Sequence, residues 1–393
     1  MSENTNYRRD FCDVFNYILN RNEPFSNKKL NIIDNIILTQ LSYIKWEHVI
    51  PNVYNSPFKR AIKLKDLVLP EYFPEMFSDD ITDEENILLF LFATASKRYR
   101  DIKIIDFSEY KSEKEETQFA ATTFELCREA IFVAFRGTDG DIVGWKENFN
   151  MAFMDEVPAQ KLATAYLNDT VSKKMLRRNY EIYVGGHSKG GNLAEYAVAG
   201  CDAEIRRYIK KVFNNDGPSF RANVKKRIVE TLNNDNVEVS KVVPFGSPVG
   251  MLLDRDKDYS IIDSKAKGIG NHAVFSWKIE GEDFIYKEDK FYGKEYMNDS
   301  INDWIESTDD KKRKEFVEKL FEILEKQNIR RFRDLNDEDL HLIKGSFSKF
   351  TDFSAEDKKM FLTILGSLLG SGVKNLPARA GKLAKKLVVD KLT

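Results

Sequence analysis

Residues 179–196 constrain the fold of this chain more than any other stretch. The segment opens with β-branched and aromatic residues, continues through a glycine-dense turn that carries Ser188, and ends in residues typical of a helix. Gly186, Ser188 and Gly190 fit the pattern G-x-S-x-G, in which a serine stands on a sharp turn between a strand and a helix. Neighbours without a Cβ let the strand and the helix approach closely. The pattern predicts a nucleophilic serine hydroxyl displayed on the turn; the plainer alternative is a tight glycine turn between core elements.

Short β-rich runs and helical periods alternate along the middle of the chain. Strands are predicted over residues 102–107, 118–124, 129–135, 209–214, 239–245, 259–263 and 274–279. Helices are predicted over residues 159–177, directly after the Ser188 turn, and over 223–232. This alternation predicts an α/β fold, with a largely parallel sheet and helices on both faces.

Helical periods also occupy both ends of the chain. Residues 7–21, 30–44 and 84–99 have the apolar spacing of helices that cover a sheet. Beyond residue 300 the period is helical at Phe316, Leu320 and Leu324, and no run resembles a strand. We therefore expect residues 1–295 to form the sheet domain with its N-terminal helices, and residues 296–393 to form a helical C-terminal extension.

Composition excludes several classes of function. Lys+Arg 61 against Asp+Glu 63 leaves a net charge of −2, so no overall field favours nucleic acid. Three cysteines without C-x-x-C spacing argue against a disulfide framework or a zinc site, and no phosphate loop is present. The first ten residues lack the apolar run of a signal peptide. We expect a soluble, cytoplasmic protein without cofactor or metal.

The last 23 residues are basic, with six Lys or Arg side chains against the single acid Asp390. Leu376, Leu383 and Leu387 could share one side of a helix that makes weak contact with a membrane surface. A solvated terminal helix is the favoured interpretation, because that apolar side lacks Trp and Phe.

A serine at such a turn needs a base to remove its proton. Folds built around this turn carry serine, acid and histidine in that chain order. Of the four histidines, His48 lies upstream and His187 belongs to the turn itself, where it is expected to point away and pack. His341 falls in a helical stretch, whereas His272 lies in a glycine-rich loop beside a predicted strand, which suits a catalytic residue. The sequence therefore favours His272 as the base.

Two aspartates compete to orient His272. Asp216 follows the first strand after the turn and precedes Gly-Pro, and carboxyl ends of strands are where α/β sheets hold functional groups. Asp263 ends the run 259–263 and is the rival. Asp216 is preferred, and its role would be to hold the imidazole tautomer and to stabilise the imidazolium.

An oxyanion hole needs two N–H donors. The turn aims the Lys189 N–H at the reacting oxygen, and Thr138, at the end of the run 129–135, is the expected second donor. Residues 151–161 are rich in Met and Phe and would form either a lid or acyl-pocket wall, or part of the core.

The motifs resemble those of known lipases. Phe-Arg-Gly-Thr at 135–138, Gly-Trp at 144–145 and Gly-His-Ser-Lys-Gly-Gly at 186–191 are similar to the class 3 lipases. Residues 31–34, 41–43, 144–147, 157–160, 186–194, 216–218, 250–252, 271–272 and 276–277 resemble the bacterial Mbeg-like family over residues 10–290. That family has Gln-His-Asp where this chain has Asn271, His272 and Ala273, and residues 246–248 also differ slightly from its usual pattern.

The resemblance implies an α/β-hydrolase fold and an oxyanion hole to which Thr138 contributes a hydrogen-bond donor. Pancreatic-type lipases, which carry their acid after the same strand, support Asp216. We expect a serine hydrolase that cleaves small-molecule or lipid esters of carboxylic acids through Ser188, His272 and Asp216. The alternatives are a thioesterase or peptidase with the same triad, and a non-catalytic interaction module that keeps the fold.

Overall fold

The computed structural model describes residues 13–47, 49, 61–78, 82–171, 180–247, 249–287 and 295–331, with the short pieces 342–343, 345–346, 353–355 and 357–358. The predictions that concern His48, His341 and the basic stretch 371–393 lie outside these residues.

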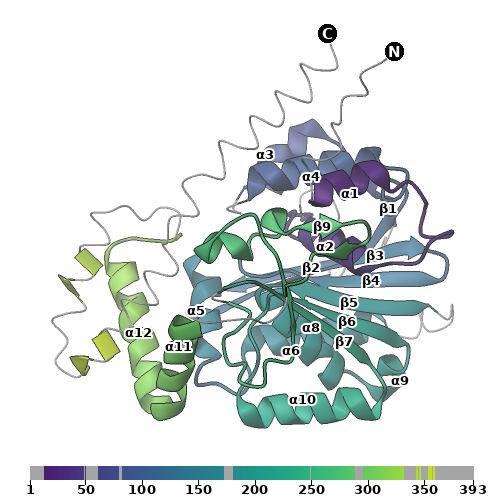
Figure 1. Ribbon diagram of the computed structural model, residues 1–393. Coiled ribbons are helices and arrows are strands. Elements are labelled where there is room, and N and C mark those ends of the chain that lie inside the picture. Colours follow the sequence, from purple (N-terminus) through teal and green to yellow (C-terminus); the bar gives the residue numbers. More distant parts are fainter. Residues whose placement is uncertain are drawn as a thin grey trace, which may run out of the picture.

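One eight-stranded sheet organises the described part of the chain (Figure 1). Its strands, in an order that is the same in space and in sequence, are β1 (Ile62–Lys63), β2 (Lys103–Ser112), β3 (Thr117–Cys127), β4 (Ala130–Phe135), β5 (Glu181–His187), β6 (Ile209–Asn215), β7 (Glu238–Pro244) and β8 (Ser260–Ile262). Strands β1 to β4 pair antiparallel, and β4 to β8 pair parallel. A hairpin of β9 (Ile279–Glu280) and β10 (Asp283–Phe284) stands apart. The predicted α/β class is confirmed.

Helices connect and cover these strands. In chain order they are α1 (Val14–Asn20), α2 (Ile32–Leu41), α3 (Phe73–Met76), α4 (Asp83–Ala95), α5 (Ile142–Asn150), α6 (Pro158–Thr170), α8 (Lys189–Gly200), α9 (Ala203–Arg206), α10 (Ala222–Asn234), α11 (Glu295–Ser307) and α12 (Asp310–Lys326). Short 3-10 turns occur at Leu64–Leu67, Pro70–Tyr72, Gly268–His272 and Val274–Ser276. Among the described helices, none has both the length and the apolar character needed to cross a bilayer.

The alternation of side chains along the strands explains why both faces of the sheet are covered. In β4, Phe132 and Ala134 join the apolar cluster that includes α1, α2 and α4, whereas Ile131, Val133 and Phe135 join the cluster formed by α6, α8 and α10. Successive residues of a strand point to opposite faces, so a strand that is apolar throughout must be buried on both. Figure 1 shows the two helical layers on either side of the strands.

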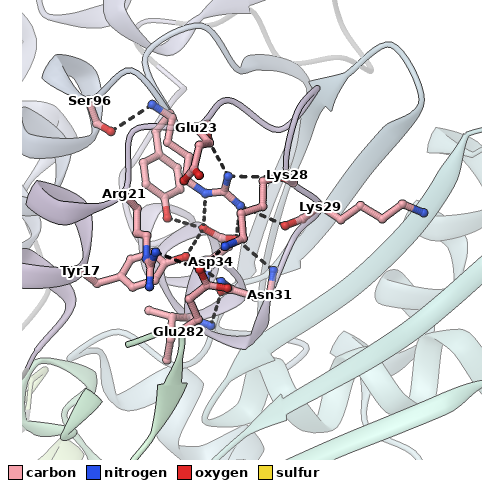
Figure 2. Close-up of polar contacts among 12 residues, drawn as sticks. Tyr17, Arg21, Glu23, Lys28, Lys29, Asn31, Asp34, Ser96 and Glu282 are labelled. Atoms are coloured by element: carbon pink, nitrogen blue, oxygen red, sulfur yellow. Dashed lines mark hydrogen bonds and ion pairs between the residues drawn. The ribbon is translucent and has the colours of Figure 1, made fainter. Parts of the chain in front are cut away.

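A buried ion pair fixes the N-terminal helices to one another (Figure 2). Asp34 in α2 accepts from the Arg98 Nε at 2.7 Å, the Tyr99 hydroxyl at 2.6 Å and the Tyr17 hydroxyl at 3.1 Å. Asp34 also accepts from the backbone N–H of Asn31, whose side chain caps the start of α2. A buried charge is tolerated only when it is paired and hydrogen-bonded. This network therefore ties α1, α2 and the segment after α4 into a single layer.

Helices α11 and α12 pack against α5 at one end of the sheet (Figure 1). Their apolar cluster includes Ile301, Trp304, Phe316 and Leu320, with Ile142 contributed by α5. Asn302 fastens α11 to the sheet domain, because its side chain accepts from the Leu253 N–H at 2.9 Å and donates to the Met251 carbonyl at 3.1 Å. Helices α11 and α12 are thus packed onto the part of the chain that forms the sheet.

The strand expected over residues 274–279 is wrong for most of its length. Residues Val274–Ser276 form a 3-10 turn, and only Ile279 enters a strand, β9. The Trp277 N–H donates to the Val274 carbonyl at 3.1 Å, and the Trp277 indole N–H donates to the Asn271 carbonyl at 2.8 Å. A short apolar run does not distinguish a strand from a turn, and here local bonds decide the outcome.

Candidate active site

Ser188 stands at the tip of a strained turn between β5 and α8. Its φ of 58° and ψ of −133° lie in a region that residues with a side chain rarely adopt. A Cβ at Gly186 would lie 2.1 Å from the Gly190 carbonyl carbon, and a Cβ at Gly190 would lie 2.1 Å from the Phe135 oxygen. Both flanking glycines are therefore required by close backbone approach.

The backbone holds this turn in place while the hydroxyl remains available. The Ser188 N–H donates to the Asn215 carbonyl at 3.0 Å, and the Gly191 N–H donates to the Ser188 carbonyl at 2.9 Å. Among the residues that the structure describes, no side chain forms a hydrogen bond with the Ser188 hydroxyl. Catalytic hydrogen bonds are commonly loose in a ligand-free protein and tighten when substrate binds.

His272 and Asp216 are paired directly. The imidazole Nδ1 lies 2.6 Å from Asp216 Oδ2, although the residues are 56 positions apart in the chain. Because a carboxylate can only accept, this contact places the proton on Nδ1 and leaves Nε2 able to accept one. His272 lies at the end of the Gly268–His272 turn, and its side chain is 17% exposed.

Asp216 is enclosed by donors at the carboxyl end of β6. Its Oδ2 also accepts from the Ser247 hydroxyl at 2.6 Å, and its Oδ1 accepts from the Gly250 N–H at 3.1 Å. Complete burial raises the pKa of this carboxyl, and the bond to His272 opposes the rise without cancelling it. A backbone φ of 56° makes Asp216 a second strained residue at this edge of the sheet.

Asp263, the rival acid, is engaged elsewhere. Its Oδ2 lies 2.6 Å from the Lys278 ammonium, and its Oδ1 lies 2.7 Å from the Lys287 ammonium. Burial acts to raise the pKa of Asp263, but the two lysines outweigh it and the pKa is lowered. Its neighbourhood is that of a surface ion pair.

His187 does not simply pack, as the sequence suggested; it contacts the loop that carries His272. Its Nε2 lies 2.8 Å from the His272 carbonyl oxygen, and its Nδ1 lies 3.0 Å from the Tyr43 hydroxyl. The rings of His187 and His272 lie with centroids 4.5 Å apart. Burial, and then the neighbouring His272, lower the pKa of His187 well below its usual range.

Thr138 lies in the turn after β4, close to α5. Its hydroxyl accepts from the Asn148 amide at 2.8 Å. The preceding Arg136 is buried against Glu109; burial disfavours its charge, but the carboxylate outweighs burial and raises the pKa of the guanidinium. These contacts fix the backbone on both sides of Gly137, whose Cα faces the Ser188 side chain closely enough that a Cβ there would lie 3.1 Å from the Ser188 Cβ.

The Lys189 side chain forms a buried ion pair. Its Nζ lies 2.8 Å from Glu147 Oε2 and donates to the Gln118 carbonyl at 2.7 Å. Glu147 is satisfied further, because it accepts from the Gln118 N–H at 3.1 Å and from the Ala159 N–H at 2.8 Å. Lys189 thus joins the first turn of α8 to β3, α5 and α6.

A cavity of about 130 Å³ opens beside Ser188. Met151 and Ala152, at the start of the stretch considered as a lid, acyl-pocket wall or core, line this cavity, and the stretch continues into α6 at Pro158. Within the described residues, no group of three or more His, Cys, Asp or Glu side chains could hold a metal ion.

Sequence reasoning missed several polar partners of the site. Tyr43, Glu147, Asn148, Ser247 and Gly250 are far from Ser188 in the chain, and their contacts depend on tertiary packing. The available signal was weak: Tyr43, Glu147 and Gly250 fall within stretches that resemble a known family, but nothing in those stretches assigns them a partner.

Comparisons with known proteins give several similar solved structures, of which three are described. The crystal structure of M37 lipase is 14% identical, covers 55% of this chain and 68% of that chain, and gives a TM-score of 0.31. The Rhizomucor miehei lipase propeptide complex is 14% identical over 52% and 70%, with a TM-score of 0.33. Lipase II from Rhizopus niveus is 14% identical over 58% and 77%, with a TM-score of 0.32.

No curated protein matches the chain significantly. The model of the Mbeg1-like family, by contrast, matches residues 93–322, which is more than half of the chain. The match spans β2 to β10, the Ser188 turn and most of α12. The chain therefore belongs to the Mbeg1-like family.

Proposed function

We propose that this protein is a serine hydrolase that cleaves carboxylic esters. The observation that carries the proposal is the 2.6 Å pairing of His272 with a buried carboxylate, at the same edge of the sheet where Ser188 occupies a strained turn. Strain and buried charge are costly, and they cluster where they serve a reaction.

In the proposed reaction the Ser188 oxygen attacks the acyl carbon while Nε2 of His272 takes the hydroxyl proton. His272 then returns that proton to the departing alcohol, leaving the acyl group on Ser188. Water repeats the sequence: its oxygen attacks the acyl-enzyme, His272 takes its proton and returns it to Ser188, and the carboxylic acid leaves. Asp216 holds Nδ1–H and stabilises the imidazolium.

Two backbone N–H groups would stabilise the negative charge that develops on the ester oxygen. That of Lys189 lies at the start of α8, where the helix dipole is positive, and that of Thr138 lies in the facing turn. The Lys189 ammonium is committed to Glu147, so its contribution comes from its backbone alone.

A fluorophosphonate probe tests the nucleophile. It should label the full-length protein, and Ser188→Ala should abolish the labelling, while Ser260→Ala, at an exposed position in β8, should leave it intact. Labelling that survives in Ser188→Ala would refute the assignment.

A second candidate function is a non-catalytic interaction module. Asn271 and Ala273 favour it, because the resembled family has Gln and Asp on either side of the corresponding histidine and a fold does not guarantee activity. It predicts a folded protein that neither reacts with the probe nor hydrolyses p-nitrophenyl esters. Turnover of matched esters, thioesters and anilides by the same preparation separates an esterase from a thioesterase or a peptidase.

A further inference from the structure

The cavity beside Ser188 lies between the sheet domain and the C-terminal helices. One wall comes from α5 and the turn after it, through Trp145, Phe149 and Met151. A second comes from the loop after β7, through Val249 and Leu252. The facing wall belongs to α11 and α12, which Figure 1 shows beside α5.

The wall from α11 and α12 is apolar and aromatic. Ile301 and Trp304 in α11, and Phe316 and Val317 in α12, all line the cavity and are all buried. The same residues form the apolar cluster that joins these helices to α5. A concave apolar surface beside a nucleophile takes a hydrocarbon group in preference to a charged one.

Both charged side chains of the lining have an ion-pair partner. The Lys189 ammonium pairs with Glu147, and an Arg313 amino group bonds to Asp310, although the buried Arg313 Nε has no hydrogen-bond partner. Because neither charge is unpaired, the lining does not favour an ionic substrate group over an apolar one.

The loop after β7 links this cavity to the proposed triad. Gly250 donates to Asp216, and three residues later the Leu253 N–H donates to Asn302 of α11 at 2.9 Å. The helices that wall the cavity are thus attached to the loop that holds the triad acid.

We propose that α11 and α12 form the acyl-binding wall of the active site, and that the substrate is an ester of an apolar acyl group of about six carbons. The inference rests on the proposed hydrolase function and adds the substrate class. Its size estimate follows from the volume: a cavity of about 150 Å³ lined by apolar side chains holds benzene, and this one measures about 130 Å³.

A series of p-nitrophenyl esters, from acetate to decanoate, tests the proposal on the full-length protein. Each methylene that enters the cavity should raise kcat/KM by about fourfold. The rise should end near hexanoate, and decanoate should be a poorer substrate than hexanoate. A profile that rises steadily to decanoate would overturn the size assignment.

Two substitutions at Val317 examine the wall itself. Val317→Phe fills the cavity and should move the optimum toward acetate, lowering kcat/KM for hexanoate by at least about tenfold. Val317→Ala enlarges the cavity and should move the optimum toward octanoate. Glu318→Ala, at an exposed neighbouring position of α12, is the matched control and should leave the profile unchanged.

Probe labelling separates failure of this proposal from failure of the proposed function. If every variant labels at Ser188 but neither Val317 substitution moves the optimum, the helices are not the acyl wall. Labelling and a cooperative melting transition also show that Val317→Phe remains folded.

A binding measurement keeps the substrate class testable without turnover. Hexanoate should change the tryptophan fluorescence of Ser188→Ala, because Trp145 and Trp304 line the cavity, and Ser188→Ala/Val317→Phe should lose the response. If no ester is hydrolysed but this pattern holds, the hydrolase function fails and the cavity's ligand class stands. If hexanoate does not bind Ser188→Ala, the ligand class is refuted.

Discussion

The imidazole of His187 lies with its Nε2 at 2.8 Å from the backbone oxygen of His272. A carbonyl can only accept, so Nε2 of His187 carries the proton. Its Nδ1 is then an acceptor in the neutral ring, and the Tyr43 hydroxyl donates to it. These hydrogen bonds therefore connect Tyr43, two residues after α2, through His187 to the backbone of His272, the proposed base.

His187→Gln should slow catalysis without abolishing it. The substitution removes the ring that lies beside the His272 imidazole and loosens the tether on the His272 loop, so the imidazole would be misplaced relative to Ser188. Misplacement by about 1 Å costs on the order of 100-fold in rate. We expect kcat for an ester to fall about 10- to 100-fold with KM little changed, measured by steady-state kinetics.

Tyr43→Phe is the milder companion to that change. It removes the donor to Nδ1 of His187 and leaves the bond to His272 intact, so its effect on kcat should be smaller than that of His187→Gln. An equal fall in kcat in both variants, or a rise in KM with kcat unchanged, would contradict a positioning role for His187.

His187 should also make stability depend on pH. Its lowered pKa keeps it neutral in the native protein, whereas in the unfolded chain it takes up a proton near pH 6.5. Below that pH the unfolded state binds the extra proton, so the free energy of unfolding falls by up to about 1.4 kcal/mol per pH unit.

Urea unfolding at pH 7.5, 6.5 and 5.5 measures this contribution. The stability advantage of the wild-type protein over His187→Gln should shrink as the pH falls. An advantage that stays constant would mean that His187 is protonated in the native state or does not titrate in this range.

Asp216→Asn and Asp263→Asn should differ widely in their effect on turnover. An asparagine at position 216 carries no negative charge to stabilise the imidazolium, and it favours the wrong tautomer of the neutral ring. This loss costs on the order of 10⁴-fold in kcat. Asp263 contacts lysines and not His272, so Asp263→Asn should stay within about threefold of wild type. Parallel assays on hexanoate and acetate esters decide between them; a larger loss in Asp263→Asn would reverse the assignment.

Much of this arrangement follows from local sequence. The G-x-S-x-G turn needs only short-range geometry, so the strand, strained serine and helix appear as predicted. Asp216 could be proposed because it directly follows β6, which neighbours β5, and parallel strands bring their carboxyl ends to one edge. The α/β class follows from the change of hydrophobic period.

The rest depends on contacts between distant segments. Nothing local to His187 shows that its ring would contact His272, and nothing in the helical period of residues 310–326 shows that Val317 would share a cavity with Ser188. The strand predicted over residues 274–279 was wrong for a related reason. The indole N–H of Trp277 donates to the Asn271 carbonyl, and this bond stabilises a turn where the apolar residues suggested a strand.

Removing one partner of the buried Lys189–Glu147 pair should cost much more stability than removing one partner of an exposed ion pair. Removing one partner leaves an uncompensated charge away from water, which costs about 3–5 kcal/mol. We expect Glu147→Gln to lower the free energy of unfolding by that order. The double variant Lys189→Met/Glu147→Gln should recover part of the loss, because no buried charge remains. Urea titrations of Glu147→Gln, Lys189→Met and the double variant complete the cycle, and additive losses would show that the pair is not coupled.

Removing the Arg313 side chain, unlike removing that of Lys189, should not leave a buried charge without a partner. Its partner Asp310 also accepts from Arg221 at 3.0 and 3.1 Å, while the buried Nε of Arg313 has no hydrogen-bond partner. Burial lowers the pKa of Arg313, and Asp310 opposes this shift without cancelling it. An unsatisfied buried donor costs about 1–3 kcal/mol. Arg313→Met keeps the hydrocarbon stem and removes that donor, so the free energy of unfolding should stay equal or rise by about 1 kcal/mol.

Arg221→Met is the informative control for this change. Arg221 donates to Asp310 and also to the Phe153 carbonyl at 2.6 Å, so its loss removes the donor to that carbonyl, whereas Asp310 keeps Arg313. It should lower stability where Arg313→Met does not, although both remove one positive charge from the same carboxylate. If Arg313→Met is the more destabilising of the two, its guanidinium supports α12 in a way that its bonds to Asp310 do not explain, and the cavity wall would depend on that charge.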